Sequence, residues 1–153
     1  MKLGRMDFPV RPKNEGRIWK SILQRFTAFD GDTIVKYMLL IYFDEQSMDE
    51  SERQPCYEES SKLAQELRES GRFLASAPLH PTTTATSVRV RDRKRLVTDG
   101  PFAETHEQLG GYFLVDAKDL DDAIDIAARI PAARYGTVEV RPVVELPSLA
   151  RAS

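Results

Sequence analysis

Strand-like and helix-like patterns alternate along the chain from about residue 36, and this order constrains the fold more than any other feature. The run KYMLLIYF at residues 36–43 is apolar on both faces and too short for an isolated helix, so it predicts a buried central strand. Helix-capping residues and apolar residues near helical spacing follow, and Gly71 is the predicted stop of this first helix. Because Pro55 must fall in a first turn or at a kink, we expect the regular helix to begin near it.

A second strand, a hairpin and a third strand are predicted next, at residues 72–79, 86–99 and 110–116. In the first arm of the hairpin Val88 and Val90 alternate with polar residues, and Asp92-Arg93 stands at its turn, where Asp-Gly would be preferred. A two-residue type I′ turn would hold Arg93 at positive φ at some cost. A longer loop is therefore an equal alternative.

The second helix has the clearest pattern. Asp119 can cap its start, and Pro131 stops it. One apolar stripe is predicted at spacing i, i+3, i+4 and i+7, formed by Leu120, Ala123, Ile124 and Ala127. A last strand is predicted for residues 137–144, and Pro142 indicates that this strand, or its end, lies at a sheet edge.

These elements form two βαβ-like halves, so the predicted fold class is α+β, a ferredoxin-like subunit with an inserted hairpin. A sheet covered by helices on one face leaves its other face bare. Met38, Leu40, Phe113 and Val115 indicate that such a face is apolar. Covering it requires burial of roughly 1,000 Å² or more against a second copy. We therefore predict a homodimer, with a pocket between sheet, hairpin and partner.

Composition limits the classes of function. A formal net charge of −2, from 24 acidic and 22 basic residues, provides no global field to attract nucleic acid or an anionic membrane. The single cysteine, Cys56, cannot form an intramolecular disulfide, and no apolar run approaches the roughly 18 residues of a membrane span. With no secretory signal pattern at the N-terminus, we expect a cytoplasmic protein that binds neither nucleic acid nor membrane.

The length of 153 residues fits one domain, which we place at residues 35–147, followed by a tail at 148–153. Residues 1–34 are basic and contain Pro and Gly in their first part, so we expect a disordered extension. A sharper expectation is that this extension is not native and that translation starts at Val35.

The segment TDGPFAETHEQLGGY at residues 98–112 resembles the signature of the DGPF-domain branch of the YCII-related family. Similar pieces at the first strand, the hairpin and the last strand extend the resemblance over about residues 36–144. The resemblance implies a dimeric α+β barrel in a family whose members mostly have no established activity. Some relatives are encoded beside, or fused to, extracytoplasmic-function sigma factors. Arg93 departs from the family, which usually has glycine at that position.

The predicted site lies around the Asp-Gly-Pro-Phe turn. Asp99 ends a strand, and Gly100 with the following proline makes a rigid bend, which places Asp99, Phe102, Glu104 and His106 close to the next strand. A carboxylate beside an apolar ring can serve as general acid or base. The structural alternative is that Asp99 caps the turn and Phe102 packs into a dimer core. No metal is predicted, because this spacing matches no strong zinc pattern.

His80 stands where the second strand ends, and it would form an imidazole-carboxylate pair if it met Asp99. We predict these two residues as catalytic, and Phe102, Glu104, His106 and Arg141 as ligand-binding, with no cofactor. Arg141 could instead pair with Glu139. The predicted function is a small-molecule-binding enzyme with an acid-base pair. The alternative is a non-catalytic regulatory or ligand-sensing module that acts with a sigma factor.

Overall fold

The computed structural model describes residues 34–145 of the chain. The tail expected at residues 148–153 and the end of the predicted domain lie outside the described residues. So does the expected N-terminal extension, except for Ile34.

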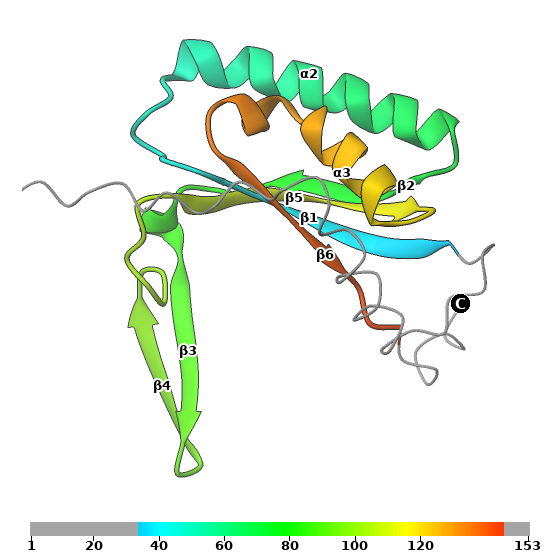
Figure 1. Cartoon of the computed structure of the whole chain (residues 1–153). Helices are drawn as coiled ribbons and strands as arrows, with labels where there is room; N and C mark the ends of the chain where they lie inside the picture. Colours follow the sequence, from blue (N-terminus) through cyan, green and yellow to red (C-terminus); the bar gives the residue numbers. More distant parts are fainter. Residues whose placement is uncertain (1–33, 146–153) are drawn as a thin grey trace, which may run out of the picture. The chain divides into compact units, whose positions relative to one another are not determined.

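A four-stranded antiparallel sheet is the centre of the described part (Figure 1). Its strands lie in the order β2-β5-β1-β6 and are β1 (Val35–Phe43), β2 (Phe73–Pro78), β5 (Gln108–Ala117) and β6 (Thr137–Pro142). Two helices, α2 (Glu50–Glu69) and α3 (Leu120–Ala128), cover one face of this sheet (Figure 1). The arrangement is compatible with a ferredoxin-like α+β fold. The predicted central position of β1 and edge position of β6 are both confirmed.

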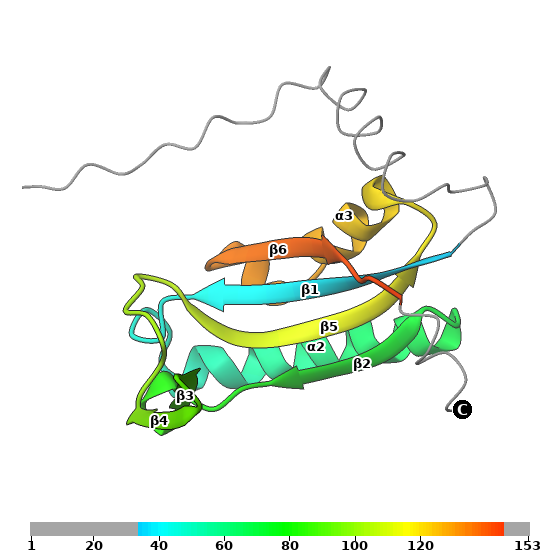
Figure 2. The ribbon, with the colours of Figure 1, turned by 90° about the horizontal axis from the view of Figure 1, so that it is seen from below.

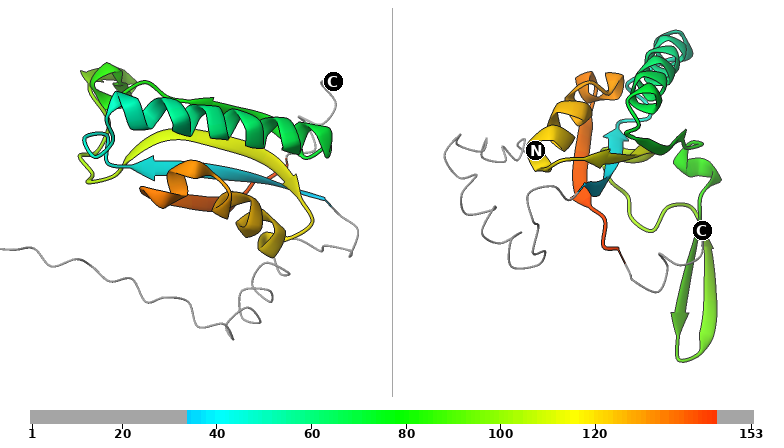
Figure 3. Two further views of the ribbon diagram at one scale, coloured as in Figure 1. Left: turned by 90° about the horizontal axis from the view of Figure 1, so that it is seen from above. Right: turned by 90° about the vertical axis from the view of Figure 1, so that its right-hand side faces the viewer.

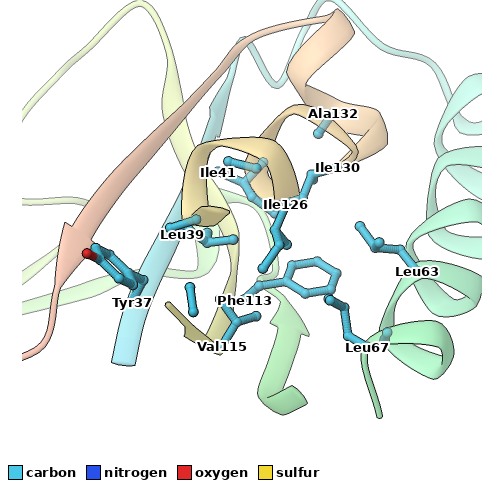
Figure 4. Close-up of a cluster of buried hydrophobic side chains, with 14 of the residues drawn as sticks. Tyr37, Leu39, Ile41, Leu63, Leu67, Phe113, Val115, Ile126, Ile130 and Ala132 are labelled. Carbon is cyan, nitrogen blue, oxygen red and sulfur yellow. The ribbon is translucent and has the colours of Figure 1, made fainter. Parts of the chain in front are cut away.

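The core lies between the covered face of the sheet and the two helices (Figure 4). Alternate residues of β1 and β5 point into it, and Leu39 and Val115 are 0% exposed. From the helices, Leu67 and Ile126 pack against them. One expectation about this sheet was wrong. Phe113 and Val115 do not share the bare face with Met38, because the register pairs them with Leu39 and Tyr37, which also point toward the helices.

Helix α2 begins earlier than predicted, at Glu50 rather than near Pro55. Its start is a capping box. Asp49 Oδ1 accepts hydrogen bonds from the backbone N–H groups of Ser51 (2.8 Å) and Glu52 (3.1 Å). The Glu52 carboxylate in turn accepts one from the Asp49 N–H (3.2 Å). These bonds satisfy the first donors of the helix and fix its start. Pro55 then lies inside the helix, which loses one backbone hydrogen bond there.

Helix α3 has the predicted N-cap, but the apolar residues that it buries differ in part from those predicted. The Asp119 Oδ1 atom accepts a hydrogen bond from the backbone N–H of Asp122 (2.9 Å). Ile124 is 39% exposed, whereas Ile126 is almost fully buried. A 3₁₀ turn, Pro131–Arg134, follows the helix, and the buried Ile130 lies just before it. Because Ile130 is buried with Ala123, Ile126 and Ala127, the stripe at i, i+3, i+4 and i+7 starts at Ala123 rather than at Leu120.

The hairpin of β3 (Thr86–Arg91) and β4 (Lys94–Asp99) projects from the sheet on the side opposite the helices (Figures 1 and 3). Asp92 and Arg93 both have positive φ, 51° and 61°, so the tight two-residue turn holds and the longer loop does not form. Within β3 and β4 every residue is exposed except Ser87, which is half-buried. The hairpin therefore has little packing of its own.

A bulge marks the start of β5. The pairing with β1 passes from Ile41–Gly111 to Tyr42–Leu109, so Gly110 is an extra residue on its strand. The ring of Phe43 lies directly over Gly110, where any Cβ atom would collide with it. Glycine is therefore required at this position for the ring to lie across the strand.

We predict that Gly110→Ala lowers the free energy of unfolding by about 1–3 kcal/mol, because the new methyl group overpacks the Phe43 ring. Urea denaturation measures the loss. The matched control is the same substitution in a Phe43→Ala background, where the collision is absent and the additional cost should be much smaller. An equal cost in both backgrounds would contradict this account of the bulge.

Candidate functional site

A cavity of about 370 Å³ lies between α2 and the sheet, near the low end of the roughly 300–1,000 Å³ common for ligand pockets. One face of α2 forms its first wall, with residues Arg53, Cys56, Tyr57, Ser60, Ser61, Ala64 and Arg68. The opposite wall comes from β1, β2 and β5. Its side chains include Ile41, Phe43, Phe73, Ser76 and Phe113. The two walls come from segments that are distant in the sequence and are brought together by the fold.

The cavity exists because small residues face each other across it. Ser60 and Ala64 of α2 lie opposite Gly111 and Ser76 of the sheet. A Cβ atom at Gly111 would lie 2.9 Å from the Ala77 carbonyl oxygen, so this strand position cannot fill the gap with a side chain. The larger Leu63 and Leu67 are buried in the neighbouring core, so α2 stays attached to the sheet beside the cavity.

Three side chains of the cavity wall, two arginines and a cysteine, differ in what they contact and in charge. Arg53 Nη2 donates hydrogen bonds to the backbone oxygens of Met48 (3.0 Å) and Glu45 (3.4 Å) and so braces the loop between β1 and α2. The Arg68 guanidinium lies over the Phe73 ring, 4.5 Å from its centroid. Burial raises the pKa of the Cys56 thiol above its ordinary value, which keeps the thiol protonated and poorly nucleophilic at neutral pH.

The base of the hairpin is a second polar region, at one end of the sheet (Figure 2). The Glu45 carboxylate accepts hydrogen bonds from the Thr82 backbone N–H (2.9 Å) and hydroxyl (2.8 Å), and the Glu45 N–H donates to Gln108 Oε1 (3.1 Å). The Gly100 N–H donates to the Ala85 carbonyl at 2.7 Å. The last bond joins the two ends of the hairpin to each other, and the others connect the turn before β3 to the sheet through Glu45 and Gln108.

The structure places His80 and Asp99 in this same region. His80 is exposed and follows β2 just before the 3₁₀ turn Thr82–Thr84, and Asp99 is the exposed last residue of β4, paired with Thr86. No hydrogen bond or ion pair within residues 34–145 joins His80 to Asp99. The catalytic pair thus stays a prediction, with its two members on adjoining segments.

The predicted ligand-binding residues are more scattered. Phe102 is 81% exposed, and Glu104 and His106 are exposed in the same loop. Arg141 lies on β6, at the opposite edge of the sheet from β2, and its Nε atom is 3.5 Å from Glu139 Oε1. The ion pair considered from the sequence therefore forms, but along one strand rather than across two. None of the six predicted site residues lines the cavity.

Sequence reasoning missed the residues that build the cavity and brace the hairpin. Ser60 and Ala64 belong to no motif, and Gly111, although it lies in the TDGPFAETHEQLGGY segment, was assigned no role; their only signal was the absence of large side chains. Glu45 and Thr82 are 37 positions apart, and nothing in their local sequence links them. Within the part of the chain that the structure describes, no group of three or more His, Cys, Asp or Glu side chains could hold a metal ion. No helix there is long and apolar enough to cross a membrane.

Residues 35–147 match the model of the YCII-related domain. The chain belongs to the YCII-related family. It is also 39% identical over 124 residues to an uncharacterized protein of Rhizobium meliloti (strain 1021), an alignment that covers 73% of this chain and 98% of that protein. The broader part of the expected resemblance is thus confirmed, and the matched range coincides with the predicted domain.

Proposed function

We propose that this YCII-related chain is a small-molecule-binding protein of the DGPF branch, and that its ligand occupies the cavity beneath α2. The cavity carries the proposal. It has the size of a ligand pocket and a mainly apolar wall with a few polar groups, which is the usual composition of such sites. The TDGPFAETHEQLGGY segment supports the assignment to the branch.

We predict that Ser60→Leu abolishes ligand binding, because the larger side chain fills the cavity from the α2 wall. The measurement is ligand-observed NMR with a library of small organic fragments. Lys62→Leu is the matched control, since Lys62 is an exposed residue of α2 outside the cavity wall and its substitution should leave the bound fragments unchanged. Fragments that bind Ser60→Leu as well as the native chain would refute the cavity as the site.

A homodimer is the second part of the proposal. Met38, Leu40, Tyr112 and Leu114 alternate with the core residues of their strands and are half-buried on the face away from the helices. The hairpin adds exposed valines on one of its own faces, Val88 (59%), Val97 (55%) and Val90 (60%). Apolar surface of this kind on both sheet and hairpin favours burial against a second copy.

We predict that Leu40→Lys converts a dimer into a monomer, because a charge on the bare face has to be desolvated on association. Analytical ultracentrifugation of the full chain measures the mass, and circular dichroism checks the fold. Ile124→Lys on α3 is the control, since Ile124 is exposed on the helix-covered side of the sheet and should leave the dimer intact. A native chain that sediments as a monomer at micromolar concentration contradicts the homodimer.

The third part is the reaction. We keep His80 and Asp99 as the proposed acid-base pair, with Phe102, Glu104, His106 and Arg141 as proposed ligand contacts. The support is that His80 and Asp99 flank the same hairpin base, where the Gly100 N–H donates to the Ala85 carbonyl and the Thr82 hydroxyl to the Glu45 carboxylate. A partner in the dimer would add the remaining surface around them.

We predict that Asp99→Asn lowers turnover of a substrate bound at the hairpin base, outside the cavity, by about 10²-fold or more while its affinity stays unchanged, since an amide keeps the shape but cannot take up a proton. Product formation is followed by NMR. Asp92→Asn at the hairpin tip is the control, with native turnover expected. If Asp99→Asn turns over its ligand at the native rate, the pair is not catalytic, and a non-catalytic ligand-sensing role, with or without a sigma factor, becomes the better reading.

A further inference from the structure

The charges in the cavity wall are all of one sign. Among its described residues, the side chains that are charged at neutral pH are Arg53 and Arg68, and no Asp or Glu joins them. This is unexpected in a chain with 24 acidic and 22 basic residues. Both arginines of α2 thus belong to the cavity face, and the lining as a whole complements an anion.

The two arginines cannot act on one anionic group together. They are 15 positions apart on α2, which corresponds to roughly 22 Å along the helix axis at about 1.5 Å per residue. Arg53 also has a structural task, because its Nη2 atom donates to the backbone oxygens of Glu45 and Met48. The anionic group is therefore assigned to Arg68.

Arg68 is held in a geometry that suits anion binding. Its guanidinium carbon lies over the Phe73 ring, 4.5 Å from the centroid, and Phe73 is itself part of the cavity wall. A cation–π contact with the ring uses none of the lone pairs of an acceptor, so the guanidinium N–H donors can still make a bidentate contact with an anion. Within residues 34–145 no carboxylate lies within ion-pair distance of Arg68 to compete for those donors.

The rest of the cavity wall indicates the chemical character of the part of the ligand that does not contact Arg68. Ile41, Phe43 and Phe113 are apolar, and two of them offer aromatic surfaces. A single cation suits a single negative charge, whereas a phosphate dianion would require further donors. The shape and the charge together describe an apolar, flat molecule with one carboxylate.

We propose that the cavity binds a small apolar monocarboxylate and that Arg68 pairs with its carboxylate group. This inference rests on the proposed function, because it names the ligand class of the same cavity. It also makes Arg68 a residue that determines ligand specificity, although no sequence motif contains it.

The test compares matched aromatic ligands on the native full-length chain by ligand-observed NMR titration. Each carboxylic acid is paired with its primary amide, which keeps the shape and removes the charge, and with the corresponding aryl phosphate. We expect the acid to bind about tenfold more tightly than the amide, as is typical of a charge-assisted hydrogen-bonded pair, and at least as tightly as the phosphate. Arg68→Met should bring the acid down to the affinity of the amide.

Two further variants separate charge from geometry. Arg68→Lys keeps the positive charge but loses the planar fork, so it should restore only part of the preference for the acid. Arg129→Met is the matched control, because Arg129 pairs with Glu66 outside the cavity wall and its loss should change no affinity. Thermal denaturation verifies that each variant is folded.

The outcomes distinguish this inference from the proposed function. If acids and amides bind equally and Ser60→Leu blocks both, the cavity remains the site and the carboxylate preference is refuted. If the acid is preferred but Arg68→Met keeps that preference, the role of Arg68 is refuted, and a much tighter phosphate refutes the monoanion. If no compound binds the native chain in a way that Ser60→Leu abolishes, the proposed function fails and this inference fails with it.

Discussion

Burial of one face of β1 and β5 under the two helices is the interaction on which the other features depend. Leu39 and Val115 lie on adjacent central strands and are fully buried, and Leu67 and Ile126 reach them from the two helices. Each such side chain contributes about 1.5–3 kcal/mol when it leaves water. Because side chains alternate along a strand, burying this face at once directs the intervening residues to the opposite face.

The cavity is a local exception within that burial. Along α2, large leucines point into the core, while the neighbouring face toward β2 carries serines and an alanine. Where those small residues face Gly111, the helix and the sheet do not close completely. Filling the space with larger apolar residues would add stability, and this open space is the observation on which the proposed ligand site rests.

On the hairpin and the bare sheet face, by contrast, apolar side chains are present but are not covered. There, apolar side chains stay open to solvent: Val88 and Val97 lie opposite each other in register, yet each is more than half exposed. A two-stranded hairpin is marginally stable by itself. Its base is closed by the bond from the Gly100 N–H to the Ala85 carbonyl and connected to Glu45 through Thr82, but these bonds do not cover it.

Local features of the sequence were sufficient for much of the fold. The apolar run of β1, the cap at Asp119, the edge position implied by Pro142 and the hairpin at residues 86–99 depend on near neighbours in the chain, and all of them are present. The two errors had different causes. The start of α2 was misplaced because the local capping box at Asp49, rather than Pro55, sets it, whereas tertiary packing before the 3₁₀ turn exchanged Ile124 for Ile126 in the core.

Only part of the candidate site could be predicted from local sequence features. The Asp-Gly-Pro-Phe turn is a continuous segment, so its rigid bend, with Gly100 at φ 101°, follows from local geometry. The cavity joins α2 to strands β1, β2 and β5, and its defining residues are small ones without a pattern. The sequence by itself determined the elements and their buried faces, because periodicity and capping act over a few residues. Only the tertiary structure decided where those faces fail to meet, because a gap depends on side chains brought together from distant segments.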